Sequence, residues 1–381
     1  MSGNAKVEAY LAAKKESSSP ELSKVFAELE ELYTKKLWHQ LTLGLVKLVK
    51  VPEMQQGTEL ITLYSSIITE MENKINPLSL VELAEAIYKQ YSEPKDAIVF
   101  MEKIAPKVID HKESYVYCKV LIAQVTLHQL KDKEATKTML DETEKLLDDI
   151  DGVTPVHGRF FRLASELYCQ TGAHAEYYRA CLRYLGCSEA PFDETERAQQ
   201  AFYIGLAALL GEGIYNFGEL LAHPILESLK GTSNEWLMEL LLAFNAGNIS
   251  IFERMRAQWS TQPDLLAKEM ELREKIRLLC LMEMTFKRKA FDRQLKFEEV
   301  AEETGLPVNQ VEVMVMRALS LDLVRGSIDQ VEQKINITWV QPRVLDKAQL
   351  AGMMDRLNLW CKDVDSMQKL LEEQAAPILT L

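Results

Sequence analysis

The sequence has little that could build a metal site or a disulfide framework. Its six cysteines form no CxxC pair, and they are Cys118, Cys169, Cys181, Cys187, Cys280 and Cys361. They lie within apolar helical patterns, which is typical of reduced core cysteines. The histidines form no HExxH or HxH arrangement, and the grouping of His174 with Cys169, Cys181 and Glu176 has no known metal-ligand spacing. We therefore predict neither a metal nor a cofactor.

Motifs of nucleotide binding and hydrolysis are also missing. Gly211-Glu212-Gly213 is the one GxG, it follows a predicted helix rather than a strand, and no GK[ST] accompanies it. A helix end followed by a loop explains it better than a phosphate cradle. No GxSxG is present, and no cysteine has a histidine partner that the sequence identifies. Nothing positive supports a catalytic residue, so we predict a protein that is not an enzyme.

Positive charge and long apolar runs are scarce. The net charge is −13 and the isoelectric point about 5.2, the wrong sign for a general polyanion binder. The longest apolar run, near residues 201–210, is too short to span a bilayer. The first residues lack the apolar segment of a signal peptide. We expect no membrane partner and a cytoplasmic and nuclear location.

Helical periodicity is what the sequence has in abundance. From Ser19 to Phe291 it predicts roughly fourteen helices in succession, joined by short connections and with no strand between them. Residues 217–230 and 263–291 are each expected to form one helix. This alternation favours an α-solenoid of helix pairs, close in length to tetratricopeptide repeats but without their clean consensus. A compact all-α domain is the alternative.

The period changes between residues 294 and 340. The pattern predicts a short strand at Leu295–Phe297 and a helix at Glu298–Thr304, which Gly305-Leu306-Pro307 ends. A second helix follows at Val308–Leu319. Then Leu323–Asp329 and Lys334–Val340 are predicted to form a β-hairpin. This order is that of a winged helix-turn-helix. The fold class is therefore mainly α, a solenoid followed by a winged-helix module and a C-terminal helix.

The winged-helix module is too acidic to favour nucleic acid. Residues 294–343 contain eight acidic and five basic residues, a net charge of −3. Phosphate binding needs clustered lysine or arginine. The hairpin instead offers an apolar face and a strand edge that could pair with another chain, and its candidate contact residues are Val324, Ile328, Ile335, Ile337 and Trp339. The alternative is that this face packs on the module's own helices.

A heptad pattern follows the module. Its apolar residues are spaced by alternating steps of three and four, and they are Leu350, Met353, Leu357, Trp360, Val364, Met367 and Leu371. Such a seam predicts a helix that contacts a partner helix or a bundle. The alternative is that the helix packs back on its own domain.

The layout and several motifs resemble the PCI domain family, shared by the proteasome lid, the COP9 signalosome and translation initiation factor three. The similar positions are Phe297, Val300-Ala301, Val311-Glu312, Arg317-Ala318-Leu319, the wing motif Gly326–Gln330 and the turn Phe244–Asn248. Segments 214–229 and 243–255 resemble a proteasome lid subunit, and this resemblance covers essentially all 381 residues.

The resemblance implies a non-catalytic scaffold subunit of the 26S proteasome regulatory particle lid, acting in assembly for ubiquitin-dependent degradation. Its partners would be other lid subunits in a hetero-oligomer: a neighbouring PCI subunit at the wing, and the lid helical bundle at the C-terminal helix. A scaffold of another PCI complex, such as the signalosome, is the first alternative. A winged-helix nucleic-acid-binding protein is the second.

We expect five segments along the chain. These are a flexible N-terminus (1–18), an N-terminal helical-repeat arm (19–170), the helical part of a PCI domain (171–291), the winged-helix module (292–343) and the C-terminal heptad helix (346–373).

Overall fold

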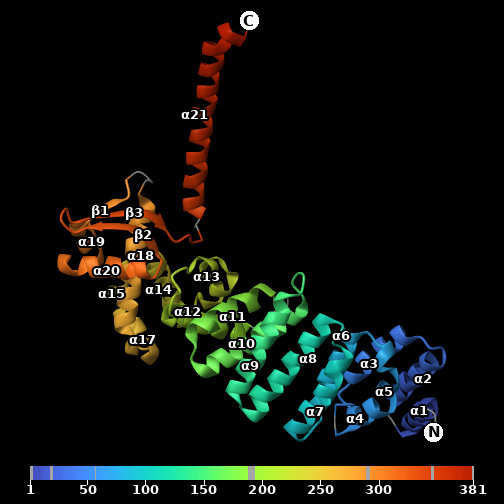
Figure 1. Cartoon of the computed structure of the whole chain (residues 1–381). Helices are drawn as coiled ribbons and strands as arrows, with labels where there is room; N and C mark the ends of the chain where they lie inside the picture. Colours follow the sequence, from blue (N-terminus) through green and yellow to red (C-terminus); the bar gives the residue numbers. More distant parts are fainter. Residues whose placement is uncertain are drawn as a thin grey trace. The chain divides into compact units, whose positions relative to one another are not determined.

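The computed structural model describes residues 3–17, 20–55, 57–187, 194–288, 292–344 and 347–379. These residues are mainly helical, with one three-stranded sheet among them (Figure 1). The chain divides into two compact units, Met1–Ala190 and Pro191–Leu381. The predicted fold class is confirmed, although this division lies about one helix beyond the expected boundary at residue 170.

Unit 1 is built from helices alone within the described residues. Their bounds are α1 (Gly3–Ser17), α2 (Pro20–Thr34), α3 (Trp38–Val49), α4 (Glu59–Leu63), η1 (Tyr64–Ile68), α5 (Thr69–Met71), η2 (Glu72–Lys74), α6 (Pro77–Tyr88), α7 (Pro94–Ile104), η3 (Ala105–Lys107), α8 (Lys112–Val125), η4 (Thr126–Leu130), α9 (Lys133–Asp148), α10 (Pro155–Thr171) and α11 (His174–Cys187). Consecutive helices pack on each other, and α6, α8 and α10 also lie side by side (Figure 1).

Local signals begin and end these helices. Asn76 caps α6 by accepting a hydrogen bond from the backbone N–H of Leu78, and Asp132 caps α9 in the same way. Gly172 ends α10 in the left-handed conformation, at φ 72°. The apolar stripes between these signals then supply a continuous core, as expected for stacked helix pairs.

The first helix differs from the expectation of a flexible N-terminus. The structure places residues 3–17 in α1, which packs on α2. Val7 and Leu11 of α1 are buried. The spacing of four residues puts both on one helix face, and tertiary packing of that face stabilises a segment with little intrinsic amphipathicity.

Unit 2 contains shorter helices, the sheet and a long terminal helix. Their bounds are α12 (Glu194–Leu210), α13 (Gly218–Ala222), η5 (Pro224–Leu229), α14 (Glu235–Asn245), α15 (Ile249–Arg254), α16 (Arg256–Trp259), α17 (Pro263–Ala267), α18 (Glu269–Lys287), β1 (Gln294–Lys296), α19 (Phe297–Thr304), α20 (Val308–Ser320), β2 (Val324–Asp329), β3 (Lys334–Val340) and α21 (Lys347–Leu379). The expected single helix over residues 217–230 is wrong, because His223-Pro224 divides it into α13 and η5.

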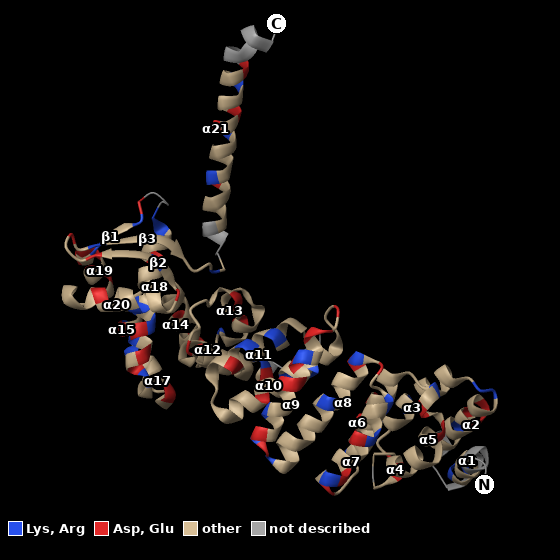
Figure 2. Cartoon of the chain, viewed as in Figure 1, with Lys and Arg blue, Asp and Glu red and all other residues tan. Residues whose placement is uncertain are grey.

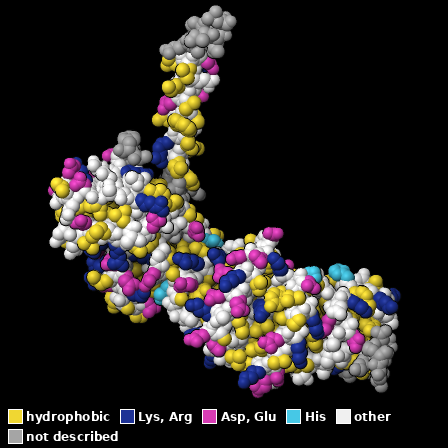
Figure 3. All heavy atoms as spheres, in the orientation of Figure 1, with side chains coloured by type: hydrophobic (Ala, Val, Ile, Leu, Met, Phe, Trp, Pro, Cys, Tyr) yellow, Lys and Arg dark blue, Asp and Glu magenta, His cyan; other side chains and the backbone are white. Residues whose placement is uncertain are grey.

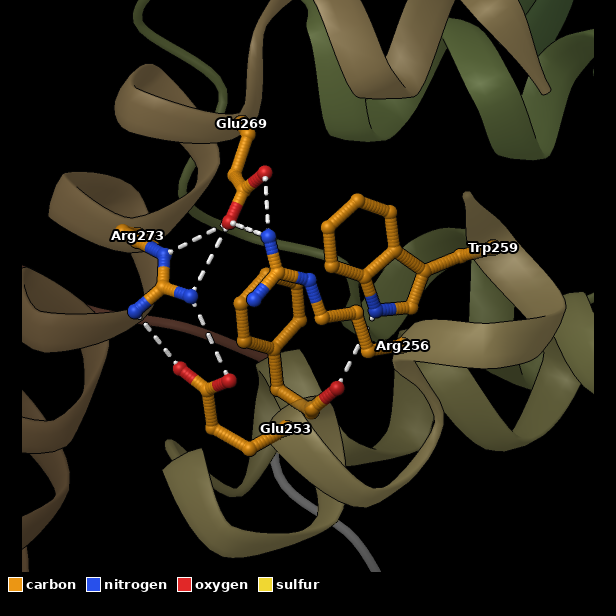
Figure 4. Close-up of polar contacts among 6 residues, drawn as sticks. Glu253, Arg256, Trp259, Glu269 and Arg273 are labelled. Atoms are coloured by element: carbon orange, nitrogen blue, oxygen red, sulfur yellow. Dashed lines mark hydrogen bonds and ion pairs between the residues drawn. The ribbon is translucent and has the colours of Figure 1, made fainter. Parts of the chain in front are cut away.

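The expected helix over residues 263–291 is also divided, into α17 and α18, and Phe291 lies outside the described residues. Near this break, an ion-pair network holds α15 and α16 on α18 (Figure 4). Arg273 lies 2.7 Å from Glu253 and 2.9 Å from Glu269, and Glu269 also binds Arg256 at 3.0 Å. Each such partly exposed pair contributes about 1 kcal/mol or less.

The buried side of this region is aromatic. The rings of Phe252 and Trp259 stack with centroids 5.0 Å apart, and Phe244 meets Phe252 edge to face. The Trp259 indole donates its N–H to the carbonyl oxygen of Phe252 at 3.0 Å (Figure 4). These contacts give the small helices α15 and α16 a fixed place despite their length.

The winged-helix module has the element order that the sequence predicts. Gly305 ends α19 at φ 63°, where its N–H binds the carbonyl oxygen of Ala301. The sheet order is β1-β3-β2, and both pairings are antiparallel. Side chains from the strands and from α19 and α20 share one core, and they include Leu295, Val300, Val311, Val315, Ala318, Val324, Ile335 and Ile337.

Candidate protein-interaction surfaces

The five predicted wing residues lie mostly inside the module. Val324, Ile335 and Ile337 are buried in its core, while Ile328 and Trp339 are half-buried. The apolar face of the hairpin therefore packs on the module's own helices, which is the alternative that the sequence left open. As contact residues for another chain, these side chains stay an untested prediction.

The longer of the two outer edges of the sheet is at β2. Because β3 lies between β1 and β2, both of its edges are hydrogen-bonded to a neighbouring strand. The outer strands are β1 and β2, and β2 is the longer one. Near the start of β2 the register shifts between Arg325 and Gly326, with Thr338 as the extra residue on β3. The Thr338 hydroxyl donates to the Arg325 carbonyl oxygen at 3.0 Å. Residues 325–327 are exposed, so a backbone edge is available there for pairing.

The module carries few basic side chains that are not already paired. Arg317 pairs with Glu274, Arg325 with Asp322, Lys334 with Glu332 and Arg343 with Glu283. In Figure 2 the basic positions of the module are scattered among acidic ones. The second helix of the motif, α20, contributes Arg317 and Glu312, so it lacks the clustered cations that phosphate binding requires.

The heptad residues are exposed along α21. Every side chain from Leu350 to Glu372 is exposed, and Trp360 and Met367 are 64% and 67% accessible. Figure 3 shows hydrophobic side chains along the coloured part of this helix. The helix begins at Lys347 and continues through Pro377 to Leu379, whereas Asp346 lies outside the described residues. An exposed apolar stripe of this length is typical of a surface that contacts another helix.

The segment just before α21 is fixed to unit 2. The Arg343 guanidinium, with a side chain 7% exposed, pairs with the Glu283 carboxylate and donates to the Asn245 carbonyl oxygen at 3.2 Å. It also lies over the Phe286 ring, 5.0 Å from the centroid. The Val344 N–H donates to the Asn216 side chain at 3.4 Å. This anchor was missed from the sequence, because its hydrogen-bond partners are 60 to 128 residues away.

A second buried cation was also missed. Lys275 donates to the carbonyl oxygens of Ala208, Leu209 and Gly211 at 2.8 to 2.9 Å, and so caps the carboxyl end of α12. Burial lowers the pKa of Lys275 to about 7, and nearby Lys268 adds to this effect. The sequence signal is a single lysine on the mainly apolar buried side of α18, which alone does not reveal a cap.

The structure bears on the metal-ligating and thiol residues that the sequence singles out. The described residues contain no group of three or more histidine, cysteine, aspartate or glutamate side chains that could hold a metal ion. Cys118, Cys181 and Cys280 are buried, and burial raises the pKa of each thiol, to about 12, 11 and 11. Cys169 and Cys361 are exposed, unlike the core cysteines expected throughout. Within the same residues, no helix has the length and apolarity to cross a bilayer.

Two family models match successive parts of the chain, and the first extends from unit 1 into unit 2. One, described as PSD13 N-terminal repeats, matches residues 25–241. The other, the PCI domain, matches residues 250–339, which include α15 to α20 and most of the sheet. The expected combination of helical repeats and a PCI domain is confirmed.

Similar proteins align with nearly the whole chain. The 26S proteasome non-ATPase regulatory subunit 13 homolog B of Arabidopsis thaliana is 39% identical over 366 residues, 93% of this chain and 94% of the relative. The subunit 13 of Dictyostelium discoideum is 34% identical over 94% of this chain and 95% of its own length. The regulatory subunit RPN9 of Saccharomyces cerevisiae is 32% identical over 99% of this chain and 100% of its length.

A signalosome protein is similar over a smaller region. The COP9 signalosome complex subunit 7a of Mus musculus is 26% identical over 164 residues, 43% of this chain and 56% of the relative. The likeness to a different PCI complex is therefore partial, whereas the likeness to the proteasome subunits extends over both units.

Proposed function

The chain belongs to the family of 26S proteasome non-ATPase regulatory subunit 13, and we propose that it joins the regulatory particle lid through α21 and the edge of β2. The family is non-catalytic, and the prediction that this chain is not an enzyme is confirmed. Its role is to hold neighbouring subunits in place for ubiquitin-dependent degradation. The partners are other subunits of the same particle.

The exposed stripe on α21 is the observation that carries this proposal. A helix with seven apolar residues in heptad spacing is poorly stabilised while that stripe faces water. Packing the stripe against helices of neighbouring subunits buries Leu357, Trp360 and Val364 and removes that cost. The Arg343 anchor supports this use of α21, because a fixed segment before the helix lowers the entropy lost when the helix binds.

The β2 edge supplies the second contact in this proposal. A strand of a neighbouring winged-helix module could pair with the exposed backbone at residues 325–327 and continue the sheet. The contact would come from the backbone rather than from Val324, Ile335 or Ile337, whose side chains the module's own core already uses. The half-buried Trp339, with Arg325 over its ring at 4.5 Å, would lie beside such a contact.

The α21 contact is tested by changing Val364 and Met367 together to Asp. Because both side chains are exposed in the free chain, the double variant should fold normally. Two carboxylates in a buried helix seam should reduce incorporation into the particle by at least about tenfold. Incorporation is measured by native electrophoresis and co-sedimentation of the tagged chain with purified particles.

A matched control changes Lys362 and Lys369 to Asp, since these residues lie at heptad positions opposite the seam. The control variant alters the charge of the same helix by twice as much, and it should still assemble. Equal incorporation of the seam variant and the wild type would refute the α21 contact. Equal loss in both variants would show that general charge, not the seam, determines assembly.

A further inference from the structure

A third surface lies between α18 and α20, apart from the β2 edge and α21. It is an open groove of about 220 Å³, with Leu278 at its base and Leu306, Val313 and Met314 along its side. Val313 is 62% exposed, although it belongs to a helix whose other face packs in the module core. The volume is below the range usual for small-molecule sites, and it suits one inserted apolar side chain.

The charge of this groove differs from that of its surroundings. Arg277 and Arg317 line it, together with Glu274. Arg317 pairs with Glu274 at 2.7 Å. Arg277 is half-buried, and no carboxylate among the described residues forms an ion pair with it. The groove therefore has one uncompensated positive charge, beside a winged-helix module whose net charge is −3.

An uncompensated, half-buried guanidinium beside apolar side chains favours a particular kind of ligand. A carboxylate can accept two hydrogen bonds from the planar guanidinium, and the low polarity of the groove strengthens that pairing. Nucleic acid is a poor fit, since a single unpaired arginine provides little phosphate affinity. A helical segment can present an apolar anchor and a carboxylate three or four residues apart on one face.

We propose that the groove between α18 and α20 binds an acidic amphipathic segment of a partner protein. One apolar side chain of that segment packs against Leu278 and Val313, and a carboxylate one helical turn away pairs with Arg277. The proposal does not require the α21 or β2 contacts, so it can fail while the proposed function holds.

A synthetic probe tests the groove in the free full-length chain. The probe is a fluorescein-labelled helical peptide of about fifteen residues, with leucine on one face and glutamate beside it. Saturable binding, measured by fluorescence anisotropy, should weaken about tenfold in Arg277→Gln and in Val313→Asp. Arg254→Gln is the matched control, because Arg254 is exposed in the same unit and outside the groove. A peptide with lysine in place of glutamate should bind at least tenfold more weakly.

Binding that is equal in wild type and Arg277→Gln, or absent from the wild type, overturns the proposal. A photo-crosslinker at Val313 provides the second measurement, in the assembled particle. The expected product joins this chain to a segment of another subunit that contains both acidic and apolar residues. A crosslink to a second copy of this chain, to its own α21, or to a basic segment also overturns the proposal.

Discussion

At the scale of single residues, Gly326 has no room for a side chain. A Cβ atom at this position would lie 2.0 Å from the Asn336 carbonyl oxygen and 3.0 Å from the Ile337 Cα, where β2 and β3 approach at the bulge. Backbone atoms cannot move aside without breaking the pairing. We therefore expect Gly326→Ala to destabilise the module by about 2 kcal/mol or more. Hydrogen exchange of the β2 and β3 amides, followed by mass spectrometry, measures the effect.

Gly352 is the matched control for this change. It lies within α21, and a Cβ atom there would meet nothing within 4 Å. Gly352→Ala should leave the sheet amides unchanged and should stabilise the helix by roughly 0.5–1 kcal/mol. Unchanged exchange in β2 and β3 of Gly326→Ala would contradict the close approach seen between the strands.

At the scale of elements, the end of α12 depends on Lys275. Replacement by Met keeps the apolar stem but removes the donor, which in its ammonium form binds three carbonyl oxygens. Leaving these carbonyls without a partner should cost about 2 kcal/mol. We expect faster hydrogen exchange in the last turn of α12 and a lower unfolding temperature of the full chain. The control is Lys230→Met, because the Lys230 side chain is 55% exposed.

The same lysine predicts a pH dependence. Burial lowers the pKa of Lys275 to about 7 from the ordinary value of 10.5. Between these two values the unfolded chain binds the proton and the folded chain releases it, so the contribution of Lys275 to stability rises with pH. The advantage of the wild type over Lys275→Met should therefore grow between pH 7 and 9, by up to about 1.4 kcal/mol per pH unit. A constant or shrinking difference in unfolding free energy would refute this shift.

The sequence predicts elements well where a signal is local. The period change after residue 293, with the breaker Gly305-Leu306-Pro307, predicts the order of the winged-helix module, and the structure confirms it. Boundaries within the helices are less predictable. His223-Pro224 divides an apolar pattern that continues through α13 and η5. The short helices α15 to α17 end at turns, and not every one of these turns contains a glycine or a proline.

What the sequence could not predict depends on contacts between distant residues. The alternation of Val324, Ile335 and Ile337 shows an apolar face but not whether the module's own helices cover it. The central place of β3, which makes β2 the long free edge, follows from pairing with β1. The Arg343 anchor likewise needs the fold, since Glu283 is 60 residues away.

At the scale of the whole molecule, assembly should change the stability of α21 more than that of any helix already in a core. In the free chain its apolar stripe is exposed from Leu350 to Leu371, so little tertiary packing protects its amides. Such a helix opens at low cost and exchanges hydrogen quickly. In the particle, burial of the stripe should slow exchange across α21 by at least about tenfold.

The comparison is made by hydrogen exchange of the free chain and of the chain within purified particles. Helix α18 is the internal reference, because its buried residues, including Leu279 and Leu281, protect it in both states. Trp360, 64% exposed in the free chain, should also shift its fluorescence to shorter wavelength on assembly. If α21 exchanges equally fast in both states while α18 stays protected, the helix is not an assembly surface, and the β2 edge and the α18–α20 groove must account for incorporation.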